Sequence, residues 1–180
     1  MSAPADFSVV TLFAERNAKR QRERDAEEQL KRKEKEQLAE FKQRLEVFQL
    51  TEDRVHAVLD RVRRAFERGE TELLLTSFPS DFCTDGGRAV TTAGQPPINK
   101  PKKEDEEAAK DREPEWLATM PAGARIVYDY WKRNLKPGGF GFSARIVSFK
   151  GGMPGDIGLF LSWPKSTEDL QGPDGDLKAG

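Results

Sequence analysis

The pattern of hydrophobic and polar residues divides the chain into a long charged amino-terminal stretch and a more apolar remainder. No glycine or proline occurs between Pro4 and Gly69, and the first part of this stretch is rich in Glu, Lys, Arg, Gln, Leu and Ala, which favour helix. Acidic residues precede basic residues by four positions at Glu15–Lys19 and Glu27–Lys31, the more stabilising orientation of such a pair on a helix. We therefore predict an extended, charged helix within residues 1–50.

A second, amphipathic helix is predicted directly after the first. Thr51 precedes Glu52 and Asp53, which is the pattern of a helix N-cap followed by acidic residues in the first turn. Gly69 is the expected stop. Apolar residues recur at helical spacing and predict one core-facing side, made of Val55, Val58, Leu59, Val62 and Phe66.

The remainder alternates in a way that predicts short strands and one further helix. The apolar helix is expected over Ala122–Lys136, where the sequence Pro137-Gly138-Gly139 then ends it. Short apolar or alternating runs predict strands, which we place at Glu72–Phe78, Gly86–Thr92, Phe140–Phe149 and Asp156–Trp163. The predicted fold class is α+β, with the two N-terminal helices followed by a small, mostly antiparallel sheet of three or four strands packed by one helix.

Three segments follow from these elements. Residues 1–50 form an extended charged helix that serves as an interaction arm, and residues 51–163 form a small α+β domain. Within that domain, residues 93–115 carry prolines and mixed charge with no apolar face, which is typical of a flexible insertion. Residues 164–180 are polar and rich in Gly and Pro, and we predict a disordered tail.

Composition excludes several kinds of chemistry. A structural zinc site usually needs four Cys or His ligands, whereas the chain has one of each, Cys83 and His56. Two glycine clusters occur, at Gly138–Gly141 and Gly151–Asp156. The first runs from a predicted helix into a strand and the second joins two predicted strands, whereas a phosphate loop leads from a strand into a helix. We expect no metal and no cofactor, although Asp81, Asp85 and Asp156 leave a carboxylate site for Mg²⁺ conceivable.

Charge and cysteine usage bear on location. Hydrophobic residues make up 36% of the chain and charged residues 34%, and the net charge of −1 gives no general attraction to nucleic acid or anionic lipid. A single cysteine forms no internal disulfide, and the first residues lack the basic and apolar regions of a signal peptide. We expect a cytoplasmic protein that does not contact a membrane.

An apolar island lies before the charged part of the first helix and motivates the first functional hypothesis. Phe7, Val10 and Phe13 belong to this island, and we predict that they bind a protein partner or a second copy of the chain. A long coiled coil is not indicated, because heptad spacing holds for only about two heptads, at Leu38, Phe41, Leu45 and Phe48. The chain is then a non-enzymatic interaction or adaptor protein.

Two alternatives remain open. Basic residues gather at the start of the charged region 16–35 and suggest association with nucleic-acid phosphates, through Arg16, Lys19, Arg20, Arg22 and Arg24. The second alternative is a small enzyme or ligand-binding domain that uses the loops around Cys83, Asp85, Gly152 and Asp156.

Overall fold

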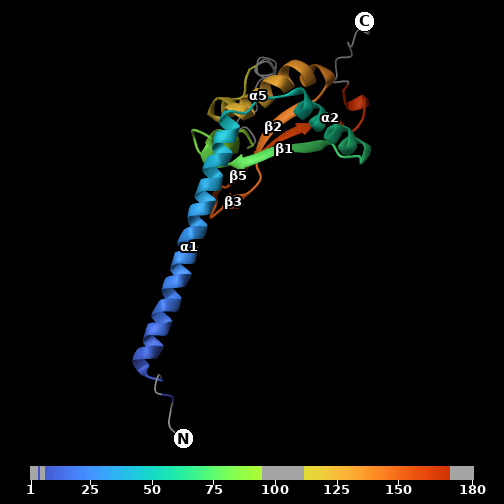
Figure 1. Cartoon of the computed structure of the whole chain (residues 1–180). Helices are drawn as coiled ribbons and strands as arrows, with labels where there is room; N and C mark the ends of the chain where they lie inside the picture. Colours follow the sequence, from blue (N-terminus) through green and yellow to red (C-terminus); the bar gives the residue numbers. More distant parts are fainter. Residues whose placement is uncertain (1–3, 5–6, 95–111, 171–180) are drawn as a thin grey trace. The chain divides into compact units, whose positions relative to one another are not determined.

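The computed structural model describes residues 4, 7–94 and 112–170 (Figure 1). Contacts along the chain define two compact units, residues 1–44 and residues 45–180, and each is described by itself. The fold is α+β, as the sequence predicts. Residues 95–111, which make up most of the predicted insertion, lie outside the described residues. Residues 171–180 of the predicted tail also lie outside them. The described part of the tail contains one helical turn, η5 (Glu168–Leu170).

The long helix α1 spans Val9–Glu46. Ser8 precedes it, and its hydroxyl accepts a hydrogen bond from the backbone N–H of Thr11 at 3.2 Å. None of the side chains from Val9 to Arg44 is buried. Packing within this unit therefore contributes little to the helix, which instead depends on its length, on its helix-favouring composition and on pairs such as Glu27–Lys31, whose charged atoms lie 2.6 Å apart.

The second helix, α2, spans Glu52–Glu67 and has the predicted signals at both ends. The Thr51 hydroxyl accepts a hydrogen bond from the Arg54 N–H at 3.4 Å, and Gly69 has a φ of +78° just after the helix. The buried face differs from the predicted one: Val62 and Ala65 are buried, whereas Phe66 is exposed. Because Ala65 and not Phe66 faces the sheet, the helix can approach the strands closely.

The main sheet has three antiparallel strands in the order β1-β5-β2. Their bounds are Glu72–Pro79 for β1, Asp156–Ser162 for β5 and Gly141–Ile146 for β2. The central strand β5 carries the buried side chains of Ile157, Leu159 and Leu161. A separate short hairpin pairs β3 (Phe149–Lys150) with β4 (Met153–Pro154), so the predicted strand over Phe140–Phe149 is divided after Ile146.

The predicted strand at Gly86–Thr92 is wrong, because these residues lead into the short helix α3 (Arg88–Ala93). The Asp85 carboxylate accepts hydrogen bonds from the backbone N–H groups of Gly87 and Ala89, at 2.9 and 2.7 Å. Gly87 has a φ of +83°, which turns the chain into the helix. A cap of this kind outweighs the strand preference of the β-branched residues that follow. The turn η1 (Ser80–Phe82) lies between β1 and this cap.

The helix predicted at Ala122–Lys136 is present but irregular. It begins as α5 (Ala122–Tyr130), widens into the π-helical turn η3 (Trp131–Leu135), and ends in the tight turn η4 (Lys136–Gly138). The turn η2 (Glu115–Thr119) precedes it. The ribbon places α2 and α5 over one face of the sheet (Figure 1). Residues of both helices line one cavity together with the core residues Phe78 of β1 and Leu161 of β5.

Aromatic side chains lock the carboxyl half of this helix to the sheet. Tyr128 packs edge-on against Trp116 and Phe142, with ring centroids 5.9 and 5.6 Å apart. The Trp131 ring lies 5.5 Å from that of Phe142, and its Nε1 donates a hydrogen bond to the Phe140 carbonyl at 2.8 Å.

Among the described residues, no helix combines the length and apolar character needed to cross a bilayer.

Candidate functional site

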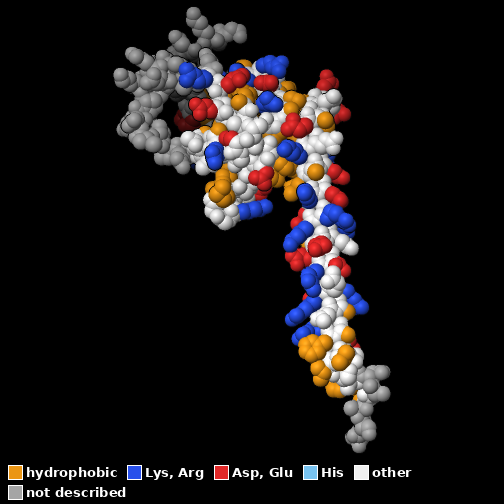
Figure 2. Space-filling view, turned by 90° about the vertical axis from the view of Figure 1, so that its left-hand side faces the viewer, with side chains coloured by type: hydrophobic (Ala, Val, Ile, Leu, Met, Phe, Trp, Pro, Cys, Tyr) orange, Lys and Arg blue, Asp and Glu red, His pale blue; other side chains and the backbone are white. Residues whose placement is uncertain are grey.

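The first sequence-predicted site lies at the amino-terminal end of α1. Phe7 is 66% exposed, Val10 78% and Phe13 49%. Val9 and Leu12 are also exposed, and we call all of these residues the N-terminal apolar cluster: Phe7, Val9, Val10, Leu12 and Phe13. Figure 2 shows hydrophobic side chains gathered at this end of the helix, with mixed charges along the rest of it. The cluster is thus an unburied apolar surface next to a strongly solvated rod.

The basic residues that suggest nucleic-acid binding follow this cluster and are all exposed. Arg16, Arg20 and Arg24 recur at intervals of four and Lys19 lies three residues after Arg16, so these four share one broad side of the helix, whereas Arg22 points away from it. The Arg16 guanidinium lies 4.6 Å from the centroid of the Phe13 ring, an exposed cation–π contact. The basic set is therefore a short stripe that begins beside the apolar cluster.

Cys83 lies at the end of η1 and is buried. Its Sγ lies 3.8 Å from Sδ of Met120. Burial, reinforced by the nearby Asp85 charge, raises the pKa of the Cys83 thiol to about 11. A thiol with this pKa is protonated at neutral pH, whereas a nucleophilic cysteine needs a stabilised thiolate. His56 is exposed on α2. Together these features do not favour nucleophilic chemistry at Cys83.

The remaining predicted loop residues have structural contacts. Although burial opposes it, hydrogen bonds from the Ala89 and Gly87 N–H groups lower the pKa of Asp85, whose carboxylate caps α3. Gly152 lies at the hairpin tip between β3 and β4 with a φ of +80°. Asp156 accepts a hydrogen bond from the Ser148 hydroxyl at 2.7 Å. The strand ends bring the hairpin base close to η1, where the Ser80 N–H donates to the Gly155 carbonyl at 2.9 Å.

We expect Cys83 to be labelled slowly by a thiol reagent in the folded protein. The rise of the thiol pKa from its ordinary value of 9.0 to about 11 lowers the thiolate fraction at neutral pH by roughly a hundredfold. Labelling at pH 7.5 is therefore expected to be about a hundredfold slower in the folded protein than in denaturant. The rate is expected to climb with pH toward the raised pKa. Equal rates in the folded and unfolded protein would contradict this prediction and revive the Cys83 alternative.

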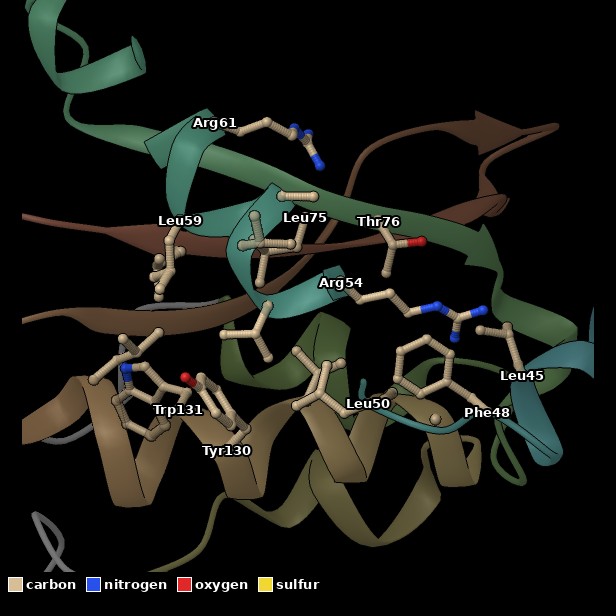
Figure 3. A pocket seen from close by; sticks show the side chains of 18 of the residues that line it. Leu45, Phe48, Leu50, Arg54, Leu59, Arg61, Leu75, Thr76, Tyr130 and Trp131 are labelled. Carbon is tan, nitrogen blue, oxygen red and sulfur yellow. The ribbon is translucent and has the colours of Figure 1, made fainter. Parts of the chain in front are cut away.

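A cavity of about 390 Å³, which sequence reasoning missed, lies within the second unit. Its walls come from the segment between α1 and α2, from α2, from β1 and from the helix that starts with α5 (Figure 3). Apolar side chains dominate the lining and include Leu45, Phe48, Leu50, Val55, Val58, Leu59, Leu75, Val127, Trp131 and Leu135. Two basic side chains, Arg54 and Arg61, also line it.

The sequence contained part of the signal for this cavity. The sequence pattern places Val55, Val58 and Leu59 on the core-facing side of α2, and Val127, Trp131 and Leu135 recur at helical spacing in the helix that starts with α5. These six side chains are half-buried because the two helices leave space between them. Periodicity identifies the face of each helix but not the distance between two helices, so the cavity itself could not be predicted.

The described residues contain no group of three or more His, Cys, Asp or Glu side chains arranged to hold a metal ion. Comparisons with protein-family models, with curated proteins and with solved structures gave no match. The features of the described residues that bear on function are therefore their exposed surfaces and the cavity.

Proposed function

We propose that this chain is a non-enzymatic interaction protein whose N-terminal helix binds a protein partner or a second copy of the chain. The observation that carries the proposal is the N-terminal apolar cluster, which is exposed on a helix that buries no side chain from Val9 to Arg44. A single exposed apolar residue is ordinary, but a cluster of them on one short segment is typical of an interaction surface.

Helix geometry supports a single binding face. Val9 and Phe13 are four residues apart, and Val10 and Phe13 are three apart, so these side chains lie close to one another on the helix surface. Leu12 lies three residues after Val9 and extends the same face. Such spacing is used when an amphipathic helix inserts its apolar side chains into a groove of another protein.

The expected energy also favours the apolar cluster over the charged rod as the source of affinity. Burial of each phenylalanine contributes about 1.5–3 kcal/mol, whereas an exposed ion pair contributes about 0–1 kcal/mol. The charged rod would then act mainly as a soluble helical spacer. Because the single cysteine, Cys83, is consistent with a reducing compartment, we propose a cytoplasmic location.

Association with nucleic acid is the alternative, supported by the shared exposed face of Arg16, Arg20 and Arg24. Phosphate contacts of this kind would weaken steeply as salt concentration rises. Partner binding through apolar side chains would respond much less to salt. This difference separates the two proposals experimentally.

The test compares two variants of the full chain. The double variant Phe7→Ser with Phe13→Ser is expected to abolish association, because it removes two aromatic side chains that the partner would bury. The expected loss of affinity is roughly a hundredfold or more. Arg20→Gln with Arg22→Gln and Arg24→Gln, the matched control, is expected to change it less than about fivefold. Sedimentation equilibrium measures self-association, and a partner captured from extract is purified and its binding remeasured, both at two salt concentrations.

The opposite ranking would overturn the proposal. If the arginine variant alone loses binding, and if the wild-type chain binds a mixed-sequence oligonucleotide with a steep salt dependence, the nucleic-acid alternative replaces it. Circular dichroism of both variants checks that the helix is retained, so that a loss of binding is not confused with a loss of structure.

A further inference from the structure

The cavity in the second unit has the dimensions of a small-molecule site. Its volume of about 390 Å³ lies at the lower end of the range of about 300–1,000 Å³ that ligand pockets occupy. A water molecule takes up about 30 Å³ in the liquid, and a methylene group is similar in size, so this space corresponds to about a dozen non-hydrogen atoms. The cavity lies between two helices and the sheet, where both β1 and β5 contribute to its lining.

The walls of the cavity determine the body of any ligand. Figure 3 shows Tyr130 and Trp131 rising from the lower helix toward α2, with Leu59 and Leu75 on the opposite wall. Nearly all the lining groups are hydrocarbon or aromatic. An apolar chain or ring would therefore leave water for this space with a favourable free energy that scales with its buried area.

The two arginines determine the charge of the ligand. Arg54 and Arg61 are seven residues apart on α2, and hence on the same side of the helix two turns apart. No aspartate or glutamate belongs to the described residues that line the cavity, and neither guanidinium forms an ion pair with a described carboxylate. The lining is therefore positively charged on one side and uncharged elsewhere.

Hydrogen bonds fix both guanidinium groups without using all their donors. Arg54 Nη1 donates to the Gln49 carbonyl at 2.9 Å, and its guanidinium lies 4.9 Å from the centroid of the Phe48 ring. Arg61 Nη2 donates to the Leu74 carbonyl at 2.8 Å. A guanidinium has five N–H groups, so each arginine keeps donors for a further acceptor. In Figure 3 the Arg54 guanidinium lies beside the Phe48 ring, and the Arg61 guanidinium lies higher in the view, close to β1.

We propose that this cavity binds a small amphipathic monocarboxylate whose apolar body, about ten carbon atoms long, lies between α2 and α5 and whose carboxylate accepts hydrogen bonds from Arg54 or Arg61. An anion is required by the charge of the lining, and a carboxylate matches the planar fork of a guanidinium. An uncharged ligand would accept only weaker hydrogen bonds from the arginines, and a cation would be repelled by them. The inference does not depend on the N-terminal helix.

The test uses decanoate as the probe, at concentrations below those at which it aggregates. Calorimetric titration of the full chain is expected to give one saturable site with a dissociation constant on the order of 10–100 µM, and the fluorescence of Trp131 in the cavity wall is expected to change in parallel. Decanol, which has the same tail without the charge, is expected to bind about tenfold more weakly, and decyltrimethylammonium is expected not to bind.

Variants test the two parts of the cavity separately. The double variant Arg54→Met with Arg61→Met is expected to lower the affinity for decanoate at least about tenfold. The control, Arg63→Met with Arg64→Met, is expected to leave this affinity unchanged, because both positions are exposed on the same helix and lie outside the cavity lining. Ala57→Phe, which places a ring at an exposed cavity position, is expected to abolish binding of both decanoate and decanol.

Absence of saturable decanoate binding would overturn the proposal. So would equal affinity for decanoate and decanol, or equal binding by the two double-arginine variants, because either result removes the role of the guanidinium groups. Binding that survives Ala57→Phe would place the ligand outside the cavity and also contradict the assignment. The variant Ala39→Phe on α1 is the control for the addition of an exposed aromatic ring.

Discussion

Replacement of Leu159 by alanine is expected to lower the free energy of unfolding by about 3–5 kcal/mol. Leu159 is fully buried at the centre of β5, the strand that pairs with both neighbours in the sheet. Its side chain faces the layer covered by the helices, and truncation would leave a cavity that the surrounding strands cannot close. Because domains of this size are typically stable by only 5–15 kcal/mol, the variant is expected to unfold at a much lower denaturant concentration.

Leu30→Ala on α1 is the matched control. Leu30 is 58% exposed, so the same chemical change removes little buried surface there and is expected to alter stability by less than about 0.5 kcal/mol. Urea unfolding followed by the near-ultraviolet signal of the tryptophans reports the second unit for both variants. Similar losses of stability in the two variants would show that Leu159 does not occupy the centre of the core.

Local signals predicted the elements of this fold well because each depends on only a few neighbouring residues. Thr51 and Gly69 bound α2 in the structure as they do in the sequence, and the apolar runs around Leu74 and Leu159 form β1 and β5. The failure at residues 86–92 came from a competing local signal. The β-branched residues Val90, Thr91 and Thr92 favour a strand, but the Asp85 carboxylate caps a helix there.

The order of the strands depends on contacts between distant residues, which a single sequence does not contain. The central strand β5 is the last strand among the described residues, and its pairing with β1 joins residues such as Glu72 and Ser162 across the length of the second unit. For the same reason the sequence indicated the N-terminal apolar cluster, a local feature, but not the cavity, which requires two helices and a strand to be placed together.

Gly123→Ala is expected to lower the free energy of unfolding by about 1–3 kcal/mol, although alanine is the better helix former. A Cβ at this position in the first turn of α5 would lie 2.6 Å from the Leu45 carbonyl oxygen and 2.9 Å from the Phe48 Cβ. The gain in helix propensity is at most about 1 kcal/mol, and it does not offset a contact with backbone that cannot rotate away. The segment from Leu45 to Phe48 must therefore move.

Gly138→Ala is the matched control, because a Cβ there meets only Phe140 ring atoms at 3.7 and 3.8 Å, an ordinary contact. Its stability is expected to stay within about 0.5 kcal/mol of the wild type. Thermal unfolding compares the two variants.

The same substitution also connects stability to the cavity. Leu45 and Phe48 line the cavity, and the Arg54 guanidinium packs on the Phe48 ring, so a displaced segment changes both the apolar wall and the position of one cationic group. Gly123→Ala is therefore expected to weaken decanoate binding even at temperatures where the variant is fully folded, whereas Gly138→Ala is not. If Gly123→Ala were as stable as the wild type and bound decanoate equally well, the close packing of α5 against the segment that leads into α2 would be refuted. With that packing, the entrance to α2 and the wall of the cavity are one structural feature, held in place because residue 123 has no side chain.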